Sequence, residues 1–243
     1  MRTVAVVLAG GSGVRLGGTT PKQLKLLAGR PVLEHSVAAF ERAPGVDEIM
    51  LVMPAGLIAE AARILGGRYS KLGEIIEGGA DRPGSTKSAI DALSRRFHPG
   101  ESPAGEEPDC NVLFHDAARP LVDQRIIADC VACLQEHQAL GVVVPTADTI
   151  VEVTDGVMTS IPPRESLARC QTPQGFRLSV IRLAYQRAAE DRGEAAFRAT
   201  DDCGMVLRYL PGVAVRVVPG SERNLKITYS ADLRIAEAAL AEE

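Results

Sequence analysis

The segment "TVAVVLAGGSGVRLGGTTPKQL", residues Thr3–Leu24, begins with an apolar, β-branched run and continues directly into glycines. Glycines occupy positions 10, 11 and 13, and Arg15 and Lys22 follow them. Such a pattern predicts a buried strand that ends in a glycine-rich loop. Glycines let backbone N–H groups approach a ligand closely, and the two cations add fixed positive charge. We therefore predict that this loop holds a polyphosphate.

The spacing of the loop excludes two familiar phosphate-binding patterns. A dinucleotide fingerprint, G-x-G-x-x-G, that started at Gly11 would need a third glycine where Leu16 stands. A P-loop would need the triplet G-K-[S/T], and the segment "GVRLGGT" from Gly13 has no lysine in that place. The loop therefore belongs to another class of phosphate site, with an arginine inside the loop and a lysine beyond it.

Short apolar runs alternate with segments of helical spacing along the chain. Strands that are apolar on both faces and alternate with helices are typical of an α/β fold, a mostly parallel sheet with helices on both faces. Ligands of such sheets bind beyond the carboxyl ends of the strands. The expected strands are "TVAVVLA", "VDEIMLVMP", "GEIIEGG", "CNVLFHD", "GVVVPTAD" and "VAVRVVPG", and the expected helices begin near Pro31, Leu57, Ser85, Asp123, Leu178 and Ala231. We interpret the Pro-, Gly- and acid-rich stretch 99–109 as a surface loop.

Composition and charge restrict the class of protein. The chain has 243 residues, of which 46% are hydrophobic, enough for one α/β domain over residues 1–243. The 27 basic and 31 acidic residues give a net charge of −4, which excludes a generally basic nucleic-acid binder or membrane-surface protein. The first apolar run is too short to span a bilayer and leads into glycines instead of a cleavage site. We therefore expect a cytoplasmic protein without nucleic-acid or membrane partners.

The chain contains five cysteines, an odd number that fits free thiols in a reducing compartment. Cys130 and Cys133 form a single C-x-x-C pattern without a second pair. Because they lie three residues apart on a predicted helix, we expect both to face the core. A zinc or redox role is the alternative for this pair.

One segment, "DTIVEVTDGVMTSIPP" at Asp148–Pro163, departs from the α/β alternation. β-Branched residues flank Asp155–Gly156, which is typical of a two-stranded hairpin. An isolated hairpin is only marginally stable in water, so this one is expected to pack on something else. We predict that residues 148–170 form an arm that contacts a partner subunit. The alternative is a hairpin folded back on its own sheet.

Six motifs in order give the chain a family resemblance. The opening L-A-G-G-x-G-x-R and P-K-Q pattern resembles nucleotidyltransferases that activate sugar and polyol phosphates. The remaining motifs are "GGADRPGS" at 78–85, "HDAARP" at 115–120, "QTPQGF" at 171–176, "TDD" at 200–202 and "NLKIT" at 224–228. With these motifs in this order, nearly the whole chain resembles the cytidylyltransferases that act on 2-C-methyl-D-erythritol 4-phosphate or on pentitol 5-phosphates such as ribitol 5-phosphate.

The resemblance implies a reaction and a Rossmann-like nucleotidyltransferase sheet with a protruding arm. A phosphate oxygen of the polyol phosphate would attack the α-phosphate of CTP, giving a CDP-polyol and pyrophosphate. That nucleophile is already anionic at neutral pH, so no general base is needed. Catalysis would come from positioning and charge neutralisation, and we assign this role to Arg15 and Lys22. Each of the two could equally be a surface charge.

The same resemblance implies a cytidine site formed by the glycine loop and the GG-x-x-R-x-x-S segment. An acid that often follows the two glycines in the family is Ala80 here, and Asp81 comes one place later, which puts the ribose contact in doubt. Arg82 lies near a helix start, where a solvated charge is its alternative role. The nucleotide-binding residues implied are Leu8, Ala9, Gly10, Gly11, Gly13, Gly79, Asp81, Arg82, Ser85 and Ala117.

Asp116 ends an expected buried strand, where a lone carboxylate among phosphates is suited to hold Mg²⁺. The alternative is a cap on the following turn. Arg119 could neutralise a substrate phosphate or fix that turn by bonding Asp116. Glu222 is a second candidate acid near the metal, or a solvated loop charge. The substrate-binding residues implied are Asp116, Arg119, Arg164, Thr172, Thr200 and Lys226, with Arg164 contributed by the neighbouring subunit of a homodimer.

Two other functions and two substrates remain open. A nucleotide-sensing module without chemistry would not need the cations and Asp116 in place, and a guanylyl- or uridylyltransferase shares only the opening loop. "HDAARP" and "QTPQGF" suit 2-C-methyl-D-erythritol 4-phosphate, which we place first. "LAGG", "IPPRESL" and "TDDCGMVLRYLP" look more like the branch that uses ribitol or ribulose 5-phosphate.

Overall fold

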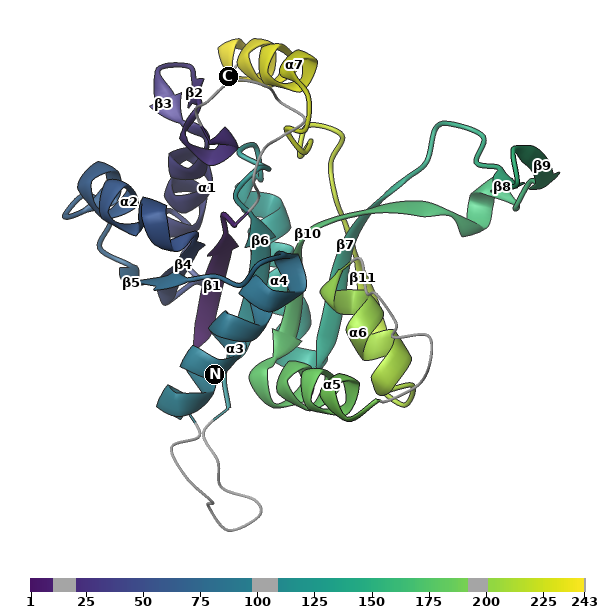
Figure 1. Ribbon diagram of the computed structural model, residues 1–243, viewed down its shortest axis with the longest axis horizontal. Helices are drawn as coiled ribbons and strands as arrows, with labels where there is room; N and C mark the ends of the chain where they lie inside the picture. Colours follow the sequence, from purple (N-terminus) through teal and green to yellow (C-terminus); the bar gives the residue numbers. More distant parts are fainter. Residues whose placement is uncertain (11–20, 98–108, 192–200, 243) are drawn as a thin grey trace.

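A computed structural model describes residues 1–10, 21–97, 109–191 and 201–242. Within these ranges, seven strands form one sheet in the order β11-β7-β10-β6-β1-β4-β5 (Figure 1). Neighbouring strands pair in parallel except β10, which runs antiparallel to both β6 and β7. The mostly parallel sheet is therefore confirmed. Its strands are β1 (Thr3–Leu8), β4 (Glu48–Met53), β5 (Leu72–Glu77), β6 (Asn111–Asp116), β7 (Ala139–Pro145), β10 (Ala168–Arg177) and β11 (Val215–Pro219).

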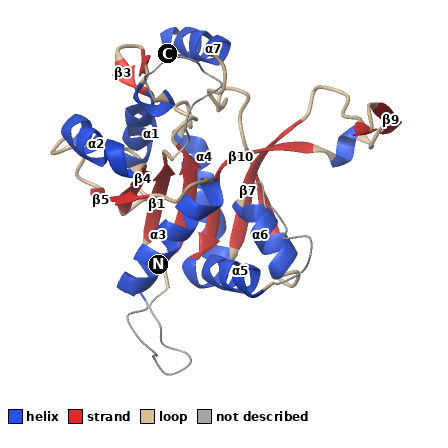
Figure 2. Cartoon of the chain, in the orientation of Figure 1, coloured by secondary structure: helices blue, strands red, loops and turns tan. Residues whose placement is uncertain are grey.

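Helices cover both faces of the sheet, as the alternating pattern predicts (Figure 2). On one face lie α1 (Val32–Glu41), α2 (Ile58–Leu65) and α4 (Gln124–Glu136). On the other lie α3 (Arg82–Phe97), α5 (Leu178–Glu190) and α6 (Asp202–Tyr209). Along β1, Ala5 and Val7 pack on the first face, and Val4 and Val6 pack on the second. Both faces of the strand are buried because each meets a helical layer.

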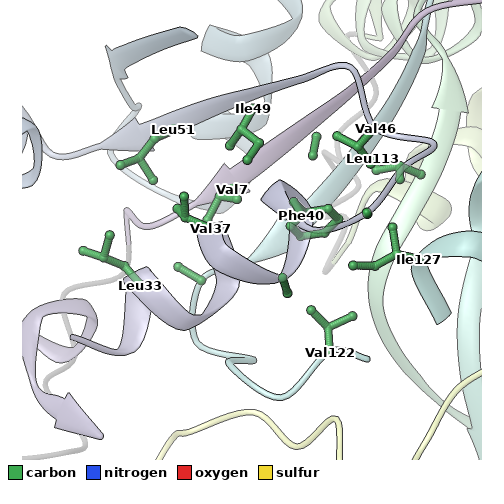
Figure 3. Close-up of a cluster of buried hydrophobic side chains, with 14 of the residues drawn as sticks. Val7, Leu33, Val37, Phe40, Val46, Ile49, Leu51, Leu113, Val122 and Ile127 are labelled. Carbon is green, nitrogen blue, oxygen red and sulfur yellow. The ribbon is translucent and has the colours of Figure 1, made fainter. Parts of the chain in front are cut away.

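The core beneath α1 fixes the first strands against each other. Val37 and Phe40 of α1 are fully buried and lie over Val7 of β1 and Ile49 of β4 (Figure 3). Burying side chains of this size stabilises the fold by about 1.5–3 kcal/mol each. This packing holds the carboxyl ends of β1 and β4 at a fixed place, next to the glycine-rich segment.

Smaller elements complete the fold at the end of the sheet where the C-terminal helix lies. Here β2 (Leu26–Leu27) pairs with β3 (Arg30–Pro31), and α7 (Ser230–Ala241) contributes to a separate apolar cluster with Leu27 and Ile227. Short 3-10 turns are η2 (Lys22–Leu24), η3 (Ala55–Leu57) and η4 (Arg164–Ser166). Among the described residues, no helix is long and apolar enough to cross a membrane.

The small strands β2 and β3 and two larger elements, β10 and α6, were not expected from the sequence pattern. β10 contains "QTPQ", whose polar residues and proline are atypical of a central strand. Gln171 and Gln174 are nevertheless buried, because each amide hydrogen-bonds to distant segments of the chain. The predicted surface loop at 99–109 lies almost wholly outside the described residues.

The hairpin at Asp155–Gly156 is confirmed, and it does not fold back on the sheet. β8 (Glu152–Thr154) pairs only with β9 (Val157–Ser160) in the described chain, and every residue of both strands is exposed. Asp155 and Gly156 have φ of 51° and 78°, the left-handed pair that a type I′ turn requires. The arm extends away from the body of the molecule (Figure 1). The alternative of a hairpin covered by its own sheet is therefore wrong.

The cysteine pair at 130 and 133 also behaves as expected. Cys130 is fully buried in the core under α4, and Cys133 packs against the same cluster. All five cysteines are free thiols.

Candidate active site

A cavity of about 300 Å³ opens beyond the carboxyl ends of β1 and β6. This is the edge of the sheet at which ligands of parallel α/β folds bind. The described residues that line it are Leu8, Ala9, Gly10, Lys22, Gln23, Ala80, Asp81, Arg82, Ser85, Asp116, Ala117, Ala118 and Lys226. The cavity thus brings together Gly10 of the predicted glycine segment, the predicted basic side chains of Lys22, Arg82 and Lys226, and the predicted carboxylate of Asp116.

Glycines bring the turn before α3 close to the end of β1. A Cβ at Gly10 would lie 2.8 Å from the Ser85 hydroxyl oxygen, and one at Gly78 would lie 2.7 Å from it. A Cβ at Gly79 would lie 2.6 Å from the carbonyl carbon of Gly84. At Gly79 the close atoms are backbone, so only glycine fits there, whereas a Cβ at Gly10 or Gly78 would require the Ser85 side chain to move. Ser85 is thereby enclosed at the cavity wall, where its hydroxyl donates to the Asp81 carbonyl at 2.9 Å.

Asp81 caps the N-terminus of α3 instead of pointing freely into the cavity. Its carboxylate oxygen accepts a hydrogen bond from the Gly84 backbone N–H at 2.8 Å, in the manner of a helix cap. The side chain remains exposed at the rim of the cavity. The role of Asp81 in nucleotide binding therefore stays a prediction.

Asp116 carries the central negative charge of the site. Lys226 Nζ lies 2.6 Å from one carboxylate oxygen, and Arg82 Nε lies 3.3 Å from the other. Burial alone would raise the pKa of Asp116, but the charges of Arg82 and Lys226 outweigh burial and hold that pKa below its ordinary value. Both oxygens contact cations and not turn N–H groups, so the capping alternative for Asp116 is wrong.

Arg82 is an ion-paired side chain and not a solvated helix-end charge. Its Nη2 lies 2.9 Å from a carboxylate oxygen of Asp202, which is fully buried. Burial alone would lower the pKa of Arg82, but the carboxylates of Asp202 and Asp116 raise it above its ordinary value. The guanidinium is therefore charged and held between two acids.

A second, polar hollow of about 210 Å³ adjoins the first and shares Arg82, Asp116 and Lys226 with it. Arg119 and Thr172 also line this hollow. Four of the six predicted substrate-binding residues therefore gather here, Asp116, Arg119, Thr172 and Lys226.

Thr172 supports the backbone at Asp116, whereas Arg119 ties the turn after β6 to the carbonyls of Cys170 and Asn224. The Arg119 guanidinium donates to the Asn224 carbonyl at 2.7 Å, so its side chain does not bond Asp116 as one alternative had it. The Thr172 hydroxyl accepts from the Asp116 N–H at 3.1 Å and lies 3.1 Å from His115 Nδ1. Thr172 therefore fixes the carboxyl end of β6 through the backbone N–H of Asp116.

Several predicted residues lie elsewhere or cannot be placed. Arg164 is on the exposed arm, where it donates to Thr149 at 3.3 Å, and it lines neither hollow. Glu222 is an exposed loop charge, as its alternative role had it; it is ion-paired with Arg169 and does not contact Asp116. The residues outside the described ranges are Gly11, Gly13, Arg15 and Thr200.

Sequence reasoning missed two buried polar residues of the site. Gln23 lines the first cavity and is buried, and neither amide atom has a hydrogen-bond partner in the described chain. The sequence feature that could have indicated Gln23 is the P-K-Q motif, in which it is the third residue. Asp202 belongs to the "TDD" motif, but its contact with Arg82 spans 120 positions and leaves no local pattern.

The donor set fits a Mg²⁺ ion only when a nucleotide supplies further ligands. No group of three His, Cys, Asp or Glu side chains in the described ranges is placed to hold a metal. Mg²⁺ is usually bound by one or two carboxylates together with substrate phosphates, and Asp116 at the cavity provides one such carboxylate. Lys226 would have to release one oxygen of Asp116 for this to occur, and its side chain is 40% exposed.

The two hollows share one cluster of two cations and a carboxylate, so two phosphate-bearing ligands can meet there. Glycine-lined space at the end of β1 suits a nucleotide, and the adjoining polar hollow suits a smaller acceptor. The fold and the site define a nucleotidyltransferase.

The family model for 2-C-methyl-D-erythritol 4-phosphate cytidylyltransferase, IspD, matches residues 3–242. The chain belongs to this family, and it is a cytidylyltransferase. The enzyme of that name from Thermobifida fusca is 50% identical over 247 residues, covering 98% of this chain and 93% of that protein. A structure of 4-diphosphocytidyl-2C-methyl-D-erythritol synthase from Anaerococcus prevotii has a TM-score of 0.81 at 25% identity, covering 99% of this chain and 96% of that one.

A further relative is named for a different activity. The bifunctional ribulose 5-phosphate reductase/CDP-ribitol pyrophosphorylase of Haemophilus influenzae is 36% identical over 240 residues. The match covers 97% of this chain and 48% of that longer protein. This chain is thus similar to proteins named for 2-C-methyl-D-erythritol 4-phosphate and to one named for CDP-ribitol.

Proposed function

We propose that the chain transfers the cytidylyl group of CTP to 2-C-methyl-D-erythritol 4-phosphate and releases pyrophosphate. The observation that carries this proposal is the pair of adjoining hollows that share Arg82, Asp116 and Lys226. The family match over residues 3–242 and the 50% identity to an enzyme of that name support the choice of both substrates.

The chemistry requires one bond to form and one to break. A phosphate oxygen of the polyol phosphate bonds to the α-phosphorus of CTP, and the bond from that phosphorus to the bridging oxygen of the β-phosphate breaks. The bridging oxygen leaves with pyrophosphate. The nucleophile is anionic without help, so no general base is needed. His115 could not act as one, because burial lowers its pKa to about 4 and both ring nitrogens have partners.

Positive charge is arranged on both sides of the reacting phosphorus in this proposal. Lys22 lines the nucleotide cavity and, with Arg15, neutralises the charge that builds on the α-phosphate and pyrophosphate. Lys226, half-exposed beside Asp116, turns from that carboxylate to the phosphate of the acceptor. Backbone N–H groups of the glycine segment enclose the triphosphate, with Ser85 at the cytidine.

We assign Mg²⁺ to Asp116 together with the phosphates of CTP. When bound, the ion would neutralise phosphate charge and fix the triphosphate geometry. Asp116 and its two cations define the place at which that charge is balanced.

The second candidate substrate is ribitol 5-phosphate, or ribulose 5-phosphate. The Haemophilus influenzae relative favours it, as do the segments "LAGG", "IPPRESL" and "TDDCGMVLRYLP". A C5 polyol and a branched C4 chain with a methyl differ mainly by a hydroxyl against an apolar group. A pocket built to bond that hydroxyl rejects its absence strongly, whereas an apolar pocket rejects an added hydroxyl only weakly.

We also propose that the chain is a homodimer joined through the arm at 148–170. The apolar side chains of Val153, Val157, Met158 and Ile161 are each at least 59% exposed on the arm. A hairpin with so little cover needs a partner surface. Arg164, which follows the hairpin on this arm, would then reach the polar hollow of the neighbouring subunit.

A complementation experiment tests the shared site. Arg164→Ala and Lys22→Ala chains, each inactive alone, should regain partial activity when mixed, because one reassembled site would be intact. No recovery, with heterodimers shown to form by mass spectrometry, would place Arg164 in its own subunit's site.

The nucleotide is tested by pyrophosphate release with each of the four nucleoside triphosphates. CTP should give the highest kcat/KM, and a preference for GTP or UTP would contradict the proposal.

We further place the protein in the cytoplasm, a compartment that suits its five free thiols.

A further inference from the structure

Asp202 is a fully buried acid with a complete set of partners. Its carboxylate accepts from Arg82 Nη2 at 2.9 Å and from the Tyr185 hydroxyl at 2.8 Å. Its backbone N–H donates to the Gln174 side-chain oxygen at 3.0 Å. An acid removed from water in this way costs stability unless each contact is made well, so a specific use for it is expected.

The helix that carries Asp202 does not need its side chain. The N-terminus of α6 is capped by the preceding residue, Asp201, whose carboxylate accepts from the Gly204 N–H at 2.8 Å. The carboxylate of Asp202 is therefore available to contact other elements, and it contacts α3 through Arg82 and α5 through Tyr185.

Arg82 is held at two nitrogens of its guanidinium, by Asp202 at Nη2 and by Asp116 at Nε. A planar guanidinium anchored at two nitrogens cannot rotate without breaking a charge-assisted hydrogen bond. In the described chain Lys226 is ion-paired with Asp116, and its side chain is 40% exposed, against 21% for Arg82. Of the two cations on Asp116, Arg82 is the fixed one and Lys226 is the one able to turn to a substrate.

We infer that Asp202 is a positioning residue for cytidylyl transfer, which holds Arg82 in place between the nucleotide cavity and the acceptor hollow. It also balances charge: two cations, Arg82 and Lys226, face two acids, Asp116 and Asp202, before substrates bind. Without the charge of Asp202, Arg82 would be drawn toward incoming phosphates and would no longer fix Asp116. This inference rests on the proposed function for its substrates.

The test is a double-mutant cycle on kcat/KM for CTP and the polyol phosphate. Asp202→Asn keeps the shape and loses the charge, and it should lower kcat/KM by about tenfold to a hundredfold, as misplacement by about 1 Å can. In an Arg82→Ala chain, the same Asp202→Asn change should lower kcat/KM by less than about twofold, because its target is gone. A residue that served only the fold would lower activity equally in both backgrounds.

The matched control is Tyr185→Phe, which removes the other hydrogen bond of the Asp202 carboxylate without touching Arg82. It should lower Tm and leave kcat within about twofold of the parent chain. Should Asp202→Asn fail to fold, Arg82→Lys makes the same test from the other side, since a lysine cannot span both acids. Full activity of Arg82→Lys would overturn the inference.

Failure of the inference is distinguishable from failure of the proposed function. If the parent chain turns over CTP with a polyol phosphate but Asp202→Asn loses less than twofold, the inference is wrong and the function stands. If the parent chain turns over no polyol phosphate, the function is wrong. Calorimetric titration of CTP then serves as the readout. If Asp202→Asn weakens CTP binding only in chains that retain Arg82, the inference is supported. If Asp202→Asn and the parent chain bind CTP equally well, the inference is contradicted.

Discussion

Replacement of Gly79 by alanine tests the close packing that builds the nucleotide cavity. A Cβ at this position would lie 2.6 Å from the Gly84 carbonyl carbon and 2.7 Å from the Gly84 Cα. Both neighbours are backbone atoms in the first turn of α3, so no side chain can rotate away. Ordinary carbon contacts are about 3.5–4.0 Å, so the helix start has to move by about 1 Å.

The expected cost follows from that displacement. Overpacking of this kind destabilises a fold by about 1–3 kcal/mol. In a domain of this size each 1 kcal/mol lowers Tm by about 2–4 °C. The shift also moves Ser85 and Arg82, which lie on the same turn and line the cavity, so CTP binding should weaken together with stability.

The assay is urea unfolding and CTP titration on the parent, Gly79→Ala and Gly212→Ala chains. Gly212 is the matched control, because a Cβ there meets no atom within 4 Å. Gly212→Ala should change stability by less than about 0.5 kcal/mol and leave CTP affinity unchanged. Equal stability and equal affinity of the two variants would refute the packing argument.

Three further predictions follow from charge and burial. Burial lowers the pKa of His115 from 6.5 to about 4, so the unfolded chain takes up the proton first as the pH falls. Stability should drop by about 3 kcal/mol between pH 6.5 and pH 4 on this account, and an equal pH dependence in a His115→Gln chain would contradict it. A hydrogen bond from Cys203 lowers the pKa of Cys170, which lines the polar hollow proposed for the acceptor. A thiol reagent followed by mass spectrometry should therefore label Cys170 before Cys110, and polyol phosphate should slow the labelling of Cys170. Faster labelling of Cys110 would count against this prediction. Lys226→Ala should lower kcat/KM for the polyol phosphate by about 10²–10³, while Lys87→Ala, a surface cation of α3, should not; similar losses in both would show that the effect is not specific to the site.

Much of the fold could be predicted because parallel strands buried on both faces carry an unmistakable apolar pattern. β1 and β6 are buried along their whole length; β1 is apolar after Thr3, and β6 contains the apolar run Val112–Phe114. β10 could not be found in this way. Its buried glutamines are compatible with a central strand only because Ser221 and Asp201 satisfy them from far along the chain.

The candidate site divides in a similar way. Asp116 and the glycine segment could be predicted from their position at strand ends, since the edge of a parallel sheet gathers such residues. Asp202 could not, because its role depends on a contact with Arg82 that only the folded chain creates. Arg164 lies on an arm remote from both hollows of its own chain, so its predicted place in a neighbour's site depends on an assembly.

The central claim, cytidylyl transfer to a polyol phosphate at the Arg82, Asp116 and Lys226 cluster, is tested most directly by parallel kinetics. The chain is assayed with CTP, Mg²⁺ and either 2-C-methyl-D-erythritol 4-phosphate, ribitol 5-phosphate or ribulose 5-phosphate. We predict the highest kcat/KM for the methylerythritol compound, with some turnover of the others. A preference of more than about a hundredfold for a pentose or pentitol phosphate, about 2.7 kcal/mol in the transition state, would contradict the substrate, and no turnover of any of the three would contradict the account itself.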